Sequence, residues 1–271
     1  MTAMKTKLPI ADGRLPMILG KGALDFMPIQ KLKFKIQNRW AFTLVELLAV
    51  IFVIGVLAAF TIPVLHGVAR LKYINTAKAE MGQLETAIDS YHATYGFYPP
   101  DSDVAPLIPS QPQLNQLYYE LTGTTNIGSS SAPVFQTLDG NLPILSSSAV
   151  QHAFGVGGFV NCSKSGGEDS TVARDFLSDL KATQVSFLTN GITGPQGIHL
   201  LVCSVGGPDA AYEPLGVAGL NPWRYKSSGT LTNNPGSYEL WVKLVIGEKT
   251  NLVCNWDSQV QVNSQQALSL P

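Results

Sequence analysis

Charged side chains are scarce in this 271-residue chain, since Asp, Glu, Lys and Arg together make up 14% of it. The short motifs of common catalytic sites are also missing: there is no G-x-S-x-G, no H-E-x-x-H and no Walker pattern. The four histidines are far apart in the sequence and offer no recognisable metal-ligand spacing. The sequence therefore predicts that the protein is not an enzyme.

Cysteine is rare as well, with three residues in the whole chain and no C-x-x-C pair. This spacing excludes a dithiol redox motif and a closed zinc site. One disulfide with a single thiol left over, and three buried thiols, are both compatible with the sequence. The residues concerned are Cys162, Cys203 and Cys254.

Positive charge is concentrated at the N-terminus. Residues 1–41 contain eight Lys or Arg against two Asp, a net charge of +6, and the remaining ten basic and seventeen acidic residues give −7. The acidic remainder predicts that nucleic acid is not a partner. A basic stretch before an apolar run predicts a cytoplasmic N-terminus and an exported remainder.

The basic stretch is followed by an apolar run from Phe42 to Leu65, in which Glu46 is the one charged residue. As a helix this run would extend about 36 Å, enough to span a bilayer. It is longer than the apolar part of a signal peptide, which has about 7–15 residues. The run predicts a transmembrane helix over residues 42–65, in a single-pass inner-membrane protein whose C-terminal domain is periplasmic.

Glu46 needs an explanation, because a carboxylate inside a membrane-spanning segment is costly and is functional by default. A functional carboxylate in this position requires a counter-charge, and the run itself contains none. The alternative is that Glu46 lies near the end of the span and reaches the polar interface.

A second helical pattern follows the apolar run. Apolar residues recur at steps of three and four, which predicts an amphipathic spine helix over residues 66–96 with one face buried. Gly96 and the Pro99-Pro100 pair then stop the helix. The apolar residues of this stripe are Ile74, Ala77, Met81, Leu84, Ile88, Tyr91 and Tyr95.

Residues 97–271 are expected to form a globular domain. The predicted fold class is α+β: a long N-terminal hydrophobic-then-amphipathic helix packed on a small antiparallel sheet. Alternation of apolar and polar residues predicts a strand over residues 238–246. Further expected elements are strands over 198–205 and 251–256, short helices over 114–121 and 172–180, and a loop-rich insertion over about 123–170.

The junction between the basic stretch and the apolar run carries a specific resemblance. Lys31 to Lys35, Arg39 and Trp40-Ala41 precede Phe42-Thr43-Leu44-Val45-Glu46, and this pattern resembles the class III signal of type IV prepilins and type II secretion pseudopilins. The resemblance implies cleavage by a prepilin peptidase between Ala41 and Phe42, with N-methylation of Phe42. The family usually has Gly where this chain has Ala41. Because the leader is long, Met27 is an alternative start to Met1.

The same resemblance implies which residues serve filament assembly. Glu46 of one subunit would pair with the Phe42 amine of a neighbour, and Gly55 and Pro63 match the helix-loosening residues of the family. The protein would be a structural subunit of a type II secretion pseudopilus or related type IV pilus. Its partners would be copies of itself, other pseudopilins, the prepilin peptidase, an inner-membrane assembly platform and, before assembly, the lipid bilayer.

A calcium site is only weakly indicated. Tyr98-Pro99 and Asn221-Pro222-Trp223 resemble segments of major pseudopilins, in which a calcium-binding loop follows the second segment. The acidic cluster of that loop is missing here, and calcium usually takes six to eight oxygen ligands. No cofactor is therefore expected, and Glu248 and Asp257 are the weak candidates for calcium ligands.

A second hypothesis belongs to a different functional class. In this alternative the protein stays permanently anchored in the membrane, and residues 97–271 act as a periplasmic module that binds a ligand or a protein. The mature N-terminus separates the two hypotheses, because only the filament subunit would begin at Phe42.

Overall fold

The computed structural model describes residues 43–102, 111–140, 143–164, 172–189, 195–205, 215, 217, 219–229 and 231–270, with only the backbone described at 60–67 and 268. The chain divides into two compact units, Met1–Val53 and Ile54–Pro271. Helix α1 (Leu44–Tyr95) contributes residues to both units.

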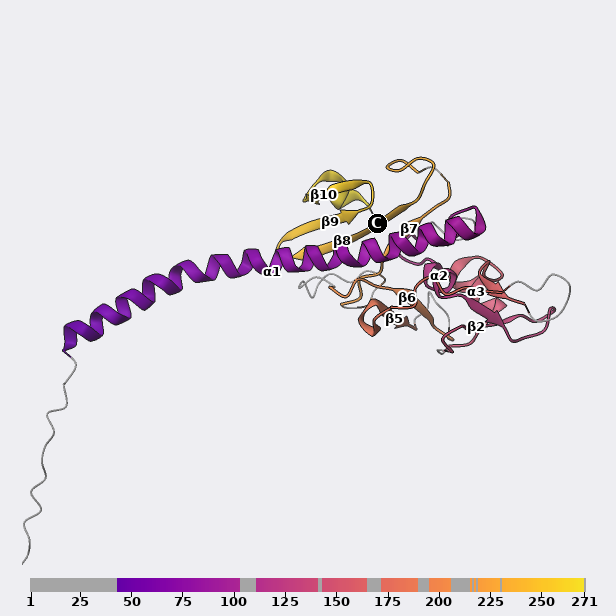
Figure 1. The fold of residues 1–271 in the computed structure, drawn as a ribbon, viewed down its shortest axis with the longest axis horizontal. Helices are drawn as coiled ribbons and strands as arrows, with labels where there is room; N and C mark the ends of the chain where they lie inside the picture. Colours follow the sequence, from indigo (N-terminus) through magenta and orange to yellow (C-terminus); the bar gives the residue numbers. More distant parts are fainter. Residues whose placement is uncertain are drawn as a thin grey trace, which may run out of the picture. The chain divides into compact units, whose positions relative to one another are not determined.

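Helix α1 ends at the predicted place. Gly96 adopts a φ of +81°, and its backbone N–H donates to the His92 carbonyl over 2.8 Å, as in a left-handed helix cap. The predicted apolar stripe is buried in its second half, where Ala77, Ile88 and Tyr91 have no exposed surface. In the second unit this part of α1 lies between the strands β7–β10 and the region that carries α2, β2, β5 and β6 (Figure 1).

The first sheet of this unit is an antiparallel meander with strand order β10-β9-β8-β7. Its strands are β7 (Arg224–Lys226), β8 (Glu239–Ile246), β9 (Lys249–Cys254) and β10 (Asp257–Val262). Arg70 on α1 donates from Nε and Nη2 to Oδ1 of Asn251 on β9, over 3.0 and 2.9 Å. Lys78 donates from Nζ to the Ser258 carbonyl over 2.7 Å. These contacts attach α1 to the sheet.

Strand β8 confirms the predicted alternation and adds a second core. Leu240, Val242 and Leu244 belong to the main core, together with the buried stripe of α1. Trp241 points to the other face, where it packs with Ala267 of α4 (Gln265–Ser269) in a smaller cluster. Both faces of the sheet are therefore covered, although the alternating pattern predicts one buried face.

The region expected to be a loop-rich insertion contains regular structure in its described residues. A four-stranded sheet has the order β3-β2-β1-β4, with β1 and β4 running parallel. Its backbone hydrogen bonds order a segment whose Gly- and Ser-rich composition predicts loop. The elements are β1 (Thr124–Asn126), β2 (Val134–Thr137), β3 (Leu145–Ser146), α3 (Ser147–Phe154) and β4 (Cys162–Ser163). Just before this region, α2 (Leu117–Thr122) confirms the short helix predicted over residues 114–121.

A third sheet pairs β5 (Val185–Leu188) with β6 (Ile198–Leu201) in antiparallel register. The 3-10 turn η2 (Ala182–Gln184) leads into β5. The helix predicted over residues 172–180 is not formed, because this segment runs through bends and turns instead. Its buried Leu177 still packs in the main core.

The predicted fold class requires correction. The described residues contain three sheets, one with a parallel pair, in place of a single small antiparallel sheet. The chain remains a mixture of helices and strands, but the pilin-like arrangement of one helix on one sheet is not found. The physical reason is that short strands in the Gly- and Ser-rich segment pair with segments that are distant in sequence, which alternation of residues does not reveal.

The predicted membrane segment requires correction as well. Within the described residues, no helix combines the length and the apolar character needed to cross a membrane. Spanning the hydrocarbon core takes about 20 consecutive apolar residues. This finding overturns the transmembrane helix predicted over residues 42–65 and the single-pass inner-membrane localisation derived from it.

A buried carboxylate joins three segments of the second unit. Glu120 on α2 has no exposed surface, and it accepts hydrogen bonds from the Val160 and Asn161 backbone N–H groups, each over 2.9 Å. The Tyr91 hydroxyl on α1 donates to the same carboxylate over 3.0 Å. Burial raises the pKa of Glu120, although these hydrogen bonds act in the opposite direction.

Candidate functional site

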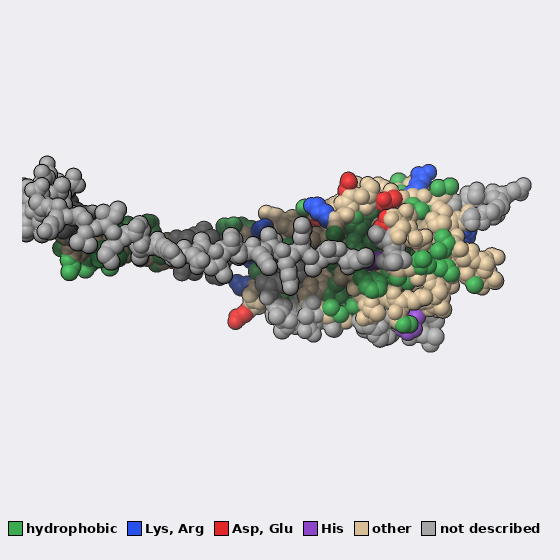
Figure 2. All heavy atoms as spheres, turned by 90° about the horizontal axis from the view of Figure 1, so that it is seen from below, with side chains coloured by type: hydrophobic (Ala, Val, Ile, Leu, Met, Phe, Trp, Pro, Cys, Tyr) green, Lys and Arg blue, Asp and Glu red, His purple; other side chains and the backbone are tan. Residues whose placement is uncertain are grey.

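The N-terminal part of α1 differs from the rest of the described chain in its surface. We call residues 44–57 the apolar segment. Its large hydrophobic side chains are between 41 and 78% exposed, and Figure 2 shows hydrophobic side chains at this end of the described helix. They are Leu44, Val45, Leu47, Leu48, Val50, Ile51, Phe52, Val53, Ile54, Val56 and Leu57.

The apolar segment is hydrophobic on every side of the helix. At 3.6 residues per turn, these side chains point in all directions around the axis, so that no polar face is left. Exposed apolar patches of this kind mark sites of association, because soluble monomers rarely expose more than a few hundred Å² of contiguous apolar surface. Covering all sides of a helix requires more than one neighbour.

Glu46 takes part in the start of α1. Its carboxylate Oε2 accepts from the Thr43 backbone N–H and from the Thr43 hydroxyl, each over 2.9 Å. In return the Glu46 backbone N–H donates to the Thr43 hydroxyl over 3.2 Å. This reciprocal arrangement is a capping box, which satisfies backbone donors at a helix N-terminus. The Thr43 backbone N–H and hydroxyl lower the pKa of Glu46, so its carboxylate is charged at neutral pH.

Sequence reasoning missed Thr43 as a functional residue. The signal was present as Thr-x-x-Glu directly before an apolar run, which is the sequence form of a capping box. Glu46 thus has a local role that needs no second molecule. Its predicted pairing with a neighbouring amine is a separate role, and one carboxylate with two oxygens has the capacity for both.

The other residues of the predicted processing and assembly site are only partly placed. Ala41 and Phe42 lie outside the described residues, and so does the side chain of Pro63. Gly55 lies on the apolar segment, and a Cβ added there would meet nothing within 4 Å. No neighbour among the residues that the structure describes therefore requires glycine at this position, and the assembly role of Gly55 stays a prediction.

The structure does not bring the two calcium candidates together. Glu248 lies in the turn before β9, and Asp257 follows β9 at its other end, so the length of that strand, about 20 Å, separates them. The Asp257 carboxylate accepts from the Gln259 backbone N–H over 2.8 Å and from Gln261 Nε2 over 3.1 Å. Within the described ranges, no group of three or more His, Cys, Asp or Glu side chains is arranged to hold a metal ion.

The three cysteines are buried as thiols. Burial raises the pKa of all three thiols, that of Cys254 to about 11, so that they stay protonated and unreactive at neutral pH. Of the two arrangements compatible with the sequence, the structure has the one with buried thiols.

Comparison of the chain with protein-family models, with curated proteins and with solved structures gives no match. A conclusion about function therefore depends on the chain's own residues. The two features that carry chemical information at this site are the exposed apolar segment and its single acid, Glu46.

Proposed function

We propose that this protein is a structural subunit of a helical filament of the type II secretion pseudopilus or type IV pilus class. In this proposal a prepilin peptidase cleaves the chain between Ala41 and Phe42, and the subunits polymerise through the apolar segment of α1. The observation that carries the proposal is the exposure of every large hydrophobic side chain in that segment.

Association through the apolar segment has a clear driving force. Burial of apolar surface contributes about 25 cal/mol per Å², and this segment has apolar surface on all sides. The second half of α1 does not offer a comparable surface, because its apolar stripe is buried by the chain's own strands. Copies of the same segment are suitable occupants, since a bundle of apolar helices covers each member on several sides.

Charge attraction would fix the stagger between neighbouring copies in this packing. Cleavage would create a positive amine at Phe42, four residues before the carboxylate of Glu46. Two opposite unit charges about 4 Å apart attract by about 4 kcal/mol at an effective dielectric constant of 20. Desolvation offsets much of this attraction, so the pair selects one stagger between neighbouring copies more than it adds stability.

The mature N-terminus tests the proposal directly. The full-length gene is expressed in a host with a prepilin peptidase and in the same host lacking that enzyme, and the intact protein is analysed by mass spectrometry. We expect N-methylated Phe42 as the first residue only when the peptidase is present. An uncut leader in both hosts would refute the proposal.

A further inference from the structure

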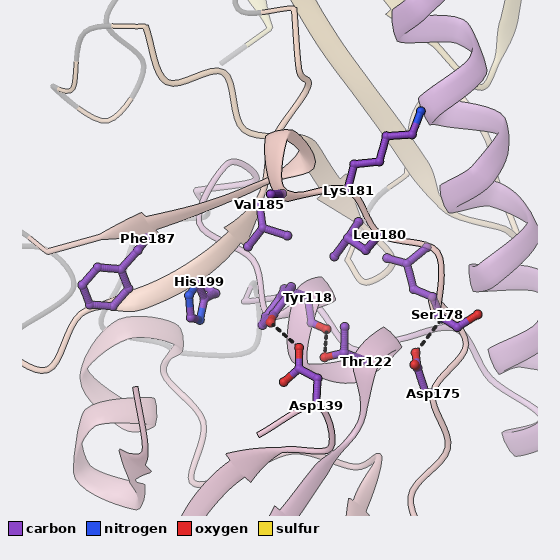
Figure 3. A pocket seen from close by; sticks show the side chains of 12 residues that line it. Tyr118, Thr122, Asp139, Asp175, Ser178, Leu180, Lys181, Val185, Phe187 and His199 are labelled. Atoms are coloured by element: carbon purple, nitrogen blue, oxygen red, sulfur yellow. Dashed lines mark hydrogen bonds between the residues drawn. The ribbon is translucent and has the colours of Figure 1, made fainter. Parts of the chain in front are cut away.

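A cleft in the second unit has no part in the proposed assembly. It has a volume of about 590 Å³, which is within the usual range of about 300–1,000 Å³ for ligand pockets. Its walls come from α2, from the chain between residues 175 and 182, and from β5 and β6 (Figure 3). The side chains that matter for recognition are Tyr118, Asp139, Asp175, Ser178, Phe187 and His199.

Asp139 is held in position at one side of the cleft. Its Oδ1 accepts from the Thr137 hydroxyl over 2.6 Å, and its Oδ2 accepts from the Tyr118 hydroxyl over 3.4 Å. Tyr118 is buried on α2, so the carboxylate is tied to a rigid element. Asp175 also lines the cleft, and its Oδ1 accepts from the Leu177 backbone N–H over 2.8 Å. Two ordered carboxylates therefore border the cavity.

His199 supplies a neutral imidazole to the same cleft. It lies on β6, where its backbone N–H donates to the Tyr119 hydroxyl over 2.8 Å, and its ring lies 5.2 Å from the Tyr118 ring. Burial lowers the pKa of His199, although the Asp139 carboxylate acts in the opposite direction. A neutral imidazole offers one donor and one acceptor.

Phe187 provides an exposed aromatic ring at the rim. Its side chain is 51% exposed, and its ring centre lies 5.4 Å from that of His199. The ring is seated against Gly197, where an added Cβ would come within 2.5 Å of Cζ. Gly197 also has a φ of +68°, which favours glycine for a second reason. The chain thus holds a large apolar ring at the edge of the cleft.

We propose that this cleft binds a neutral saccharide. Asp139 and Asp175 together outnumber Lys181, the one basic side chain in the lining, so the cleft has a net negative charge that disfavours an anionic ligand. The hydroxyl groups of a sugar both donate and accept, which matches the carboxylate acceptors, the Ser178 hydroxyl and the imidazole. The apolar face of a sugar ring packs on the Phe187 ring, as planar side chains at binding sites bury large apolar surfaces.

The test uses full-length protein in a zwitterionic detergent without a sugar headgroup. Labelled protein is applied to an array of neutral mono- and disaccharides, each printed beside its uronic-acid and amino-sugar counterpart. We expect retention on at least one neutral glycan and weaker retention on both charged counterparts. The dissociation constant for that glycan is then measured by calorimetry.

Two substitutions connect binding to the cleft. Phe187→Ala removes the stacking surface, and Asp175→Asn removes one carboxylate charge; each is expected to weaken binding at least tenfold. Phe97→Ala is the matched control, because Phe97 is similarly exposed, at 46%, and does not line the cleft. Circular dichroism verifies that all variants are folded.

Three results would overturn the proposal: no neutral glycan bound at millimolar concentration, preference for a charged counterpart, or unchanged binding by both variants. Cleavage at Phe42 and filament formation are measured on the same variants. Because the cleft and the apolar segment share no residue, a failure of saccharide binding leaves the filament proposal intact, and the converse also holds.

Discussion

Glu46 takes part in interactions of two different ranges. The contacts with Thr43 are local and shape the first turn of α1, whereas the proposed contact with a neighbouring Phe42 amine is intermolecular and depends on charge. Replacing Glu46 by glutamine separates the capping interaction from the charge interaction, because a capping box accepts Glu or Gln at this position. An alanine removes both interactions together.

We predict that Glu46→Gln is cleaved at Ala41–Phe42 and starts α1 normally, but enters filaments at least tenfold less than the native protein. The reason is that the amide keeps the acceptor oxygen and loses the charge. The measurement is the fraction of subunits in sheared filaments, determined by immunoblotting. Glu248→Gln is the control at an exposed position outside α1. Normal incorporation of Glu46→Gln would mean that helix capping is its whole role.

Glu120 is the second residue whose side chain makes several structural hydrogen bonds. We predict that Glu120→Ala lowers the free energy of unfolding by about 3 kcal/mol or more, because it leaves two buried donors and one part-buried donor without their acceptor. Urea unfolding followed by the fluorescence of buried Trp223 and Trp241 measures the change. Glu248→Ala, on the surface, is expected to change it by less than about 0.5 kcal/mol.

The pH dependence of stability gives an independent test of the same site. Folding raises the pKa of Glu120 above its ordinary value of 4.5, so the folded chain binds more protons than the unfolded chain above that pH. We predict that the native protein loses stability relative to Glu120→Gln as the pH rises above 4.5, because glutamine does not titrate. Urea unfolding of both proteins between pH 4 and 8, in steps of about one unit, determines the sign. A relative gain with rising pH would contradict the assignment.

At the scale of elements, the end of α2 depends on one glycine. Gly123 has φ and ψ of 75° and 154°, a conformation that is nearly exclusive to glycine. An added Cβ would also come within 2.8 Å of the Arg174 carbonyl oxygen. Glycine is therefore required at this position by the backbone conformation and by the close approach of a distant segment.

We predict that Gly123→Ala destabilises the protein more than Gly140→Ala does. Both glycines have a φ of +75°, but a Cβ at Gly140 would meet nothing within 4 Å. The control is therefore expected to cost about 1 kcal/mol, and Gly123→Ala at least about 2 kcal/mol more, since the Arg174 backbone must move. Equal midpoints of urea unfolding for the two variants would show that the close approach is unimportant.

At the scale of the whole molecule, assembly can be measured by crosslinking an introduced cysteine, because the native thiols are buried. We predict that a thiol reagent modifies none of the three cysteines in the native protein and all three in urea. A cysteine introduced at Val50, on the apolar segment, is expected to form disulfide-linked dimers in assembled material. Val172→Cys, at a 78% exposed position outside α1, is the control. Equal crosslinking at both positions would contradict assembly through the apolar segment.

Some features could be predicted because they depend on local chemistry. The stripe from Ile74 to Tyr91 repeats every three to four residues, and that period alone selects which face of a helix is buried. Strand β8 was found from its alternation, and the end of α1 from Gly96. The capping role of Thr43 was equally available, since it depends on residues three apart.

Other features depend on partners that are far away in the chain. The parallel pair of β1 and β4 and the coverage of Trp241 by α4 require segments that composition does not connect. The cleft joins α2 to β5 and β6, and Glu120 gains its donors from residues 40 and 41 positions later and from α1.

The sequence by itself determined the long helix and its burial stripe, the antiparallel meander at the C-terminal end and the apolar run with its single acid, because each follows from a short-range period or from composition. Only the tertiary structure decided the number of sheets, the state of the cysteines, the separation of Glu248 from Asp257 and the existence of the cleft. The reason is that these properties arise from packing between segments remote in sequence, where burial and hydrogen-bond partners are set by the fold as a whole.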